Sequence, residues 1–149
     1  MFSQDRNALR NVYILAWNKA KTDQSLEPLE QQVVEVARRH PEYHALLEAG
    51  DSVLDRDWLP EQGESNPFLH MGLHIALLEQ VATDRPPGIR KLYQQTINRC
   101  LGNTHEAEHL IMECIAEAMW KMQRNGGDAN PKALLKCIKK RAGGAGQDW

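Results

Sequence analysis

Apolar residues recur every three or four positions along most of the chain, and no stretch alternates apolar and polar residues with β-branched enrichment. A period near 3.6 residues is typical of amphipathic α-helices, whereas half-buried strands show a period of two. The pattern therefore predicts an all-α protein, a single-domain bundle of about six helices over residues 1–141. Residues 142–149 are predicted to be a disordered tail.

Proline and asparagine mark where several predicted helices begin and end. Pro67 suits the first turn of a helix, and Asn66 before it suits the N-cap. Pro41 should end the preceding helix near Arg39, because the residue before a proline avoids the helical region. The predicted helices span about 4–21, 28–39, 41–49, 67–82, 89–101, 104–124 and 131–142, with a polar connection at 50–65. The apolar stripe of the first helix is Leu9, Val12, Tyr13, Ala16 and Trp17.

Composition is that of an ordinary soluble globular protein, with 149 residues, 42% hydrophobic and 26% charged. No apolar run is long enough to cross a membrane, and residues 1–20 lack the apolar block of a signal peptide. We therefore expect a cytoplasmic protein that does not bind membranes.

Charge is distributed unevenly along the chain. Residues 1–84 carry 7 Lys/Arg against 14 Asp/Glu, net −7, and residues 85–149 carry 11 against 6, net +5. The basic end could meet an acidic partner, but the chain lacks the high pI and aromatic interleaving of a nucleic-acid binder, so no nucleic acid is expected. A small molecule, a protein partner or a homo-oligomer is compatible with this composition.

Three cysteines, Cys100, Cys114 and Cys137, make an odd number without CxxC spacing. This favours reduced thiols over a disulfide framework. Because each has apolar neighbours, we expect buried thiols that pack as small hydrophobes.

All six histidines form pairs four residues apart: His40/His44, His70/His74 and His105/His109. On a helix this spacing points two imidazoles in the same direction. Such a pair can supply two nitrogen ligands to a transition metal.

Two of these pairs lie on apolar stripes. With 100° per residue, His74 falls 40° from His70, between Leu77 and Leu78, on a helix that is apolar on nearly every side. His109 falls 40° from His105, and Glu113 at 80° extends the same stripe. The predicted metal ligands are His70, His74, His105, His109 and Glu113.

Imidazole and carboxylate ligands suit Zn, Fe or another mid-series transition metal. Glu113 would bind the ion or orient a histidine, and an open position would allow redox or hydrolytic chemistry. His40 and His44 are separated by Pro41, so their spacing does not guarantee a shared direction; His40 is a candidate cap of the preceding helix and His44 a candidate further ligand.

Two other readings stay open. Buried histidines can be satisfied by hydrogen bonds alone, and the protein would then be a non-enzymatic interaction module that uses its basic last helix (Lys132, Lys136, Lys139, Lys140, Arg141) or the 50–65 connection. The segment His-Glu-Ala-Glu-His at 105–109 also matches the HExxH pattern of zinc hydrolases, with Glu106 as the base. Glu106, however, suits a capping box with Asn103, and Glu108 is expected to face solvent.

Four stretches together resemble an uncharacterised bacterial family that is known only as a domain of unknown function. They are His40-Pro-Glu-Tyr-His44, Asn66-Pro-Phe-Leu-His70 through His74, Arg85-Pro-Pro-Gly-Ile-Arg90, and His105-Glu-Ala-Glu-His109 through Met112-Glu-Cys114. The resemblance extends over nearly the whole chain. It implies a single-domain cytoplasmic bacterial protein and supplies no activity, substrate or ligand.

Overall fold

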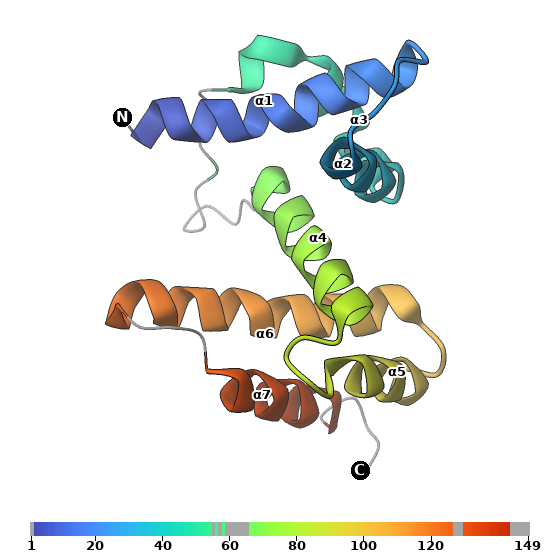
Figure 1. Cartoon of the computed structure of the whole chain (residues 1–149), viewed down its shortest axis with the longest axis vertical. Helices are drawn as coiled ribbons and strands as arrows, with labels where there is room; N and C mark the ends of the chain where they lie inside the picture. The colour runs from blue at the N-terminus through green and yellow to red at the C-terminus, as the bar shows by residue number, and fades with distance from the viewer. Residues whose placement is uncertain (1, 55, 57, 59–65, 127–129, 144–149) are drawn as a thin grey trace. The chain divides into compact units, whose positions relative to one another are not determined.

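The computed structural model describes the whole chain except residues 1, 55, 57, 59–65, 127–129 and 144–149. The described residues form seven α-helices and two short 3-10 helices, and none of them lies in a strand (Figure 1). The all-α prediction is confirmed. The elements are α1 (Phe2–Lys21), α2 (Pro28–Arg38), η1 (Pro41–Tyr43), α3 (His44–Glu48), η2 (Gly50–Val53), α4 (Pro67–Thr83), α5 (Ile89–Arg99), α6 (Thr104–Asn125) and α7 (Pro131–Gly143).

The predicted helix boundaries follow from local capping chemistry. The Asn66 side chain accepts hydrogen bonds from the backbone N–H groups of Phe68 (2.9 Å) and Leu69 (3.3 Å), so α4 begins at Pro67 as expected. α6 ends at Asn125, and its C-cap Gly126 has a φ of 69°, a left-handed conformation that glycine adopts without strain. The helix before Pro41 ends at Arg38.

The chain divides into two compact units, Met1–Ile75 and Ala76–Trp149, and the division falls within α4. Each unit is described by itself, and the single domain over 1–141 stays a prediction. α7 extends to Gly143, and Ala142 is buried in it. The other residues of the predicted tail, 144–149, lie outside the described part of the chain.

In the first unit, α1 packs against α2 and α3. The Tyr13 ring of α1 meets the Phe68 ring of α4 edge-on, with the centroids 5.7 Å apart. A Cβ on Gly72 would lie 3.4 Å from the Tyr13 hydroxyl, so the missing side chain allows this close approach. The core contains Tyr13, Ile14, Ala16, Trp17, Val33, Val34, Val36, Ala37, Leu47, Val53, Phe68 and Met71.

The sequence pattern misplaced one residue of α1. Leu9, predicted to be in the apolar stripe, is 60% exposed, while the neighbouring Arg10 is only 3% exposed. The Arg10 guanidinium donates to the carbonyl oxygens of Val53 (3.2 Å), Leu54 (2.9 Å) and Arg56 (2.7 Å). It also lies over the Trp58 and Phe68 rings, at 5.0 and 5.3 Å. Arg10 is buried because it binds the backbone that follows η2.

In the second unit, α5, α6 and α7 pack against one another. Their buried apolar residues include Ile89, Leu92, Ile111, Ile115, Leu134 and Ile138. No helix among the described residues has both the length and the apolarity needed to cross a bilayer.

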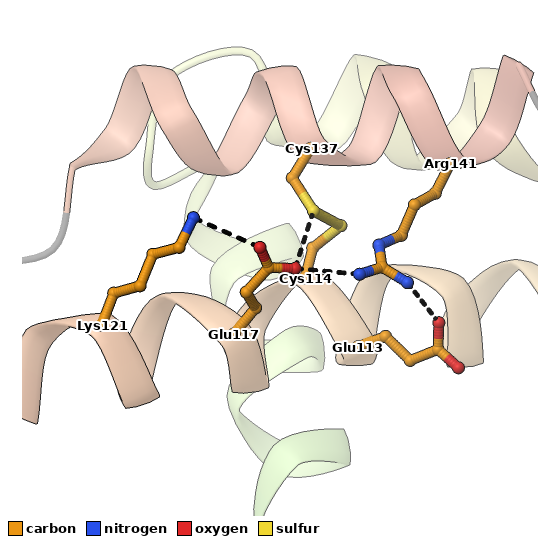
Figure 2. Close-up of a disulfide and its surroundings, with 6 residues drawn as sticks. All are labelled: Glu113, Cys114, Glu117, Lys121, Cys137 and Arg141. Carbon is orange, nitrogen blue, oxygen red and sulfur yellow. Dashed lines mark hydrogen bonds and ion pairs between the residues drawn. A yellow bond between two sulfur atoms is a disulfide. The ribbon is translucent and has the colours of Figure 1, made fainter. Parts of the chain in front are cut away.

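The prediction of three reduced thiols is wrong for two of the cysteines. Cys114 of α6 and Cys137 of α7 form a disulfide, with their Cα atoms 5.9 Å apart (Figure 2). Cys100 is a buried free thiol, and burial raises its pKa. Because the bridged cysteines are 23 positions apart in the sequence, only the packing of α7 on α6 shows that they meet.

Candidate metal centre

His40 lies between the end of α2 and Pro41, and its side chain is 1% exposed. Its Nδ1 lies 2.8 Å from the carbonyl oxygen of Val36. A carbonyl only accepts, so Nδ1 carries the proton and donates. This confirms the expected capping contact with α2. In the neutral ring it leaves Nε2 as a lone pair, the arrangement found in metal-bound histidines whose other nitrogen is held by an outer partner.

His70 lies in the first turn of α4, and its Nε2 is 3.1 Å from Nε2 of His40. The two rings are nearly perpendicular, with centroids 4.9 Å apart and an interplanar angle of 78°. Since Nε2 of neutral His40 has no proton, Nε2–H of His70 donates to it in the metal-free protein. The two Nε2 atoms are therefore joined by one hydrogen bond.

The separation of these nitrogens also fits two ligands of one metal ion. Metal–nitrogen bonds of about 2.0–2.1 Å put two ligand nitrogens roughly 3.0 Å apart in octahedral and roughly 3.4 Å apart in tetrahedral geometry. The observed 3.1 Å falls within this range. His40 and His70 are thus placed so that they could hold a metal ion, which would replace the proton of this hydrogen bond.

Two aromatic side chains fix the orientation of the His40 ring. Tyr43 stacks on it, with centroids 5.3 Å apart and an interplanar angle of 6°. His74 meets it edge-on at 5.2 Å and is itself 2% exposed. Burial raises the pKa of Tyr43, with a further contribution from the Glu42 carboxylate. The phenol of Tyr43 therefore stays neutral at physiological pH, and it packs on His40 without adding a charge to the site.

The side chains of His40 and His44 make separate contacts, as the proline between them suggested. The Nε2 atom of His44 lies 2.8 Å from the carbonyl oxygen of Ala37, and its ring packs on Trp17 with centroids 4.4 Å apart. His44 therefore stabilises the packing of η1 and α3 on α1 and α2. His40, the histidine that sequence reasoning omitted from the ligand set, is the one beside His70.

In the second unit, the rings of His105 and His109 contact one another at 4.0 Å, as the four-residue spacing predicts. The expectation that His105, His109 and Glu113 share a buried face is wrong. His105 and Glu113 are exposed, and His109 is half-buried. Arg141 Nη1 donates to Glu113 Oε2 at 2.9 Å, so this carboxylate lies in an ion pair (Figure 2). The buried face of α6 is the one with Ala107, Glu108, Ile111, Met112, Cys114 and Ile115.

Glu108 is the residue that sequence reasoning most clearly misjudged. Expected to face solvent, it is 3% exposed, and its Oε2 accepts a 2.7 Å hydrogen bond from the Tyr93 hydroxyl. Its spacing of three and four residues from Ile111 and Met112 was an available signal. Counted from His105 at 100° per residue, Glu108 falls at 300°, outside the stripe that was taken to face the core.

Replacing Tyr93 with phenylalanine is expected to destabilise the protein by about 1–3 kcal/mol, because a buried carboxylate loses a hydrogen-bond donor without a change in ring packing. Urea unfolding followed by circular dichroism measures the loss. The double variant Tyr93→Phe/Glu108→Gln should recover part of it, since the neutral amide costs less to bury. Equal stability of wild type and Tyr93→Phe would contradict this prediction.

The HExxH segment lies at the start of α6. His105 and Glu106 are both exposed, and the backbone N–H of Glu106 donates to the Asn103 side chain at 3.1 Å. Asn103 is therefore the N-cap of α6, which is the Asn103 half of the expected capping box.

Comparison with known proteins identifies a family without an assigned activity. No curated protein and no solved structure matches the chain. The family model described as "Domain of unknown function (DUF1841)" matches residues 5–140. Since this match covers most of the sequence, the chain belongs to the DUF1841 family, as its sequence motifs suggested.

Proposed function

We propose that this protein binds a transition-metal ion, with His40 and His70 as ligands. The observation that carries the proposal is the pair of facing Nε2 atoms, 3.1 Å apart, with the His40 tautomer set by the bond to Val36. Two neutral imidazoles suit zinc or iron. A position left open to substrate would support redox or hydrolytic chemistry.

The sequence predicts four further ligands: His74, His105, His109 and Glu113. Among these, His74 has its ring 5.2 Å from that of His40. Single substitutions His74→Phe, His105→Ala, His109→Ala and Glu113→Gln are expected to sort ligands from other residues. Loss of a ligand reduces the bound metal, whereas loss of the Glu113–Arg141 ion pair alone leaves it unchanged.

Elemental analysis of protein purified with and without oxygen tests the proposal directly. We expect close to one transition-metal ion per chain, released by a strong chelator and restored by adding zinc or iron(II). The melting temperature should rise with metal, because an ion that binds only the folded state stabilises it. Protein that contains no metal and shows no thermal shift with zinc, iron, manganese or copper would refute the proposal.

A second candidate is an interaction module whose core histidines are satisfied by hydrogen bonds. It is favoured by the chain from His70 through His40 to the Val36 carbonyl, which is complete without a metal. The α7 residues Lys132, Lys136 and Lys140 are exposed and could contact an acidic partner. This candidate predicts no thermal shift with metal and a salt-sensitive complex that is lost when these lysines are neutralised.

A zinc hydrolase that uses Glu106 is the third candidate. Because Glu106 is exposed and only its backbone N–H takes part in the cap, as donor to the Asn103 side chain, we expect Glu106→Gln to retain its metal and to leave any hydrolytic turnover unchanged. Activity screening of wild type and variant with peptide and ester substrates checks this. Turnover that disappears in a variant with full metal content would establish the hydrolase instead.

A further inference from the structure

The two cysteines of the α6–α7 disulfide differ in their exposure. Cys114 is 1% exposed, within the core of the second unit, whereas Cys137 is partly exposed on α7. A thiolate from solution must reach a sulfur atom before it can attack a disulfide. Of the two cysteines, Cys137 is the one that reaches the surface of its helix.

The surroundings of Cys137 form a second, non-covalent connection between the same helices. Arg141 of α7 donates to Glu113 and to Glu117 of α6, both at 2.9 Å. Lys121 also pairs with Glu117, at 3.2 Å (Figure 2). These cations lower the pKa of Glu117, so it stays ionised at neutral pH and keeps its bond to Arg141. α7 therefore has a polar attachment to α6 that survives when the disulfide is opened.

We propose that Cys114–Cys137 is a thiol–disulfide exchange site that low-molecular-weight thiols enter at Cys137. A thiolate attacks the Sγ atom of Cys137, the bond to Cys114 breaks, and Cys114 leaves as a thiolate that takes a proton from water. A second thiolate attacks the sulfur of the first reagent in the mixed disulfide and releases Cys137 as a thiolate, which also takes a proton from water. Two thiols are oxidised to one disulfide, and the protein disulfide is reduced to two thiols.

Reduction removes the covalent connection between α6 and α7 while the Arg141 bridge and the packing of Leu134 and Ile138 remain. The bridged cysteines enclose a loop with a sequence separation of 23. A crosslink of this length restricts the unfolded chain, so reduction is expected to lower the melting temperature by roughly 5–15 °C. The stability of α7 on α6 thus depends on the concentration of reducing thiols in the surrounding solution.

Counting thiols in the full-length protein provides the first test. After aerobic purification and denaturation we expect one reactive thiol, that of Cys100, and three after dithiothreitol treatment of the folded protein followed by removal of the reagent. Three thiols without dithiothreitol, or a disulfide that dithiothreitol reduces only once the protein unfolds, would overturn the proposal.

Matched variants provide the second test. In Cys114→Ser, Cys137 should form a mixed disulfide with oxidised glutathione at least ten times faster than Cys114 does in Cys137→Ser, measured by intact mass. Circular dichroism establishes that both variants are folded. Cys100→Ser is the control, and its Cys114–Cys137 disulfide should exchange with thiols at the wild-type rate. Equal rates for the two single variants would overturn entry at Cys137. If either variant unfolds, the wild-type protein is used instead. A disulfide that reduced glutathione cannot reduce while the protein is folded would then overturn the proposal.

Discussion

Replacing His70 with alanine is expected to lower the affinity for the transition metal by more than the roughly 10- to 100-fold that loss of an outer-shell partner costs. The reason is that His70 supplies one of the two facing Nε2 atoms. His40→Phe should have an equal effect, because it keeps a ring between Tyr43 and His74 but removes both nitrogens. Competition titration against a chelating dye measures the affinities.

His44→Phe is the matched control for these variants. It keeps a ring on Trp17, and the Ala37 carbonyl still accepts the backbone N–H of His40 at 3.0 Å. Its metal affinity should stay within about twofold of wild type, since His44 makes no contact that the proposed site requires. Unchanged binding in both His70→Ala and His40→Phe, with folding intact, would exclude this pair as ligands.

Replacing Arg10 with methionine is expected to lower the free energy of unfolding by about 3 kcal/mol or more. Each hydrogen bond to a charged group contributes roughly 1.5–3 kcal/mol, and the substitution removes three carbonyl contacts together. Methionine retains part of the contact with Trp58 and Phe68, so the change reports mainly on the polar contacts. Urea unfolding provides the measurement.

Arg56→Met is the control, because Arg56 also lies over Trp58, at 5.0 Å, but is exposed. It should cost less than about 1 kcal/mol. Arg10→Lys should fall between the two, since an ammonium keeps the charge and can donate to carbonyl oxygens but lacks the flat guanidinium that lies over the Trp58 and Phe68 rings. Equal losses in Arg10→Met and Arg56→Met would show that the carbonyl contacts contribute little.

The helices themselves could be predicted because their signals are local. Pro41 ended one helix and separated the directions of His40 and His44, and Asn66 with Pro67 began another. The contact between His105 and His109 follows from helical geometry alone. In each case the residues that decide the outcome lie within one or two turns of one another.

Which residues form the candidate site was harder to predict from the sequence. His40 was set aside because it follows a helix end, yet this position lets its Nδ1 reach the Val36 carbonyl and its Nε2 reach His70. Glu113 seemed to extend a buried stripe, but it pairs with Arg141, 28 residues away. A carboxylate at the edge of a stripe has no local feature that indicates whether its partner is a metal, a cation or water.

By itself, the sequence determined that this chain is helical, where most of its helices begin and end, and that its histidines occur in pairs. Tertiary structure alone decided that His40 faces His70, that Arg10 and Glu108 are buried, and that Cys114 meets Cys137. The physical reason is distance along the chain. Helix formation depends on hydrogen bonds four residues apart, whereas these contacts depend on the rotation and packing of helices that are separated by tens of residues.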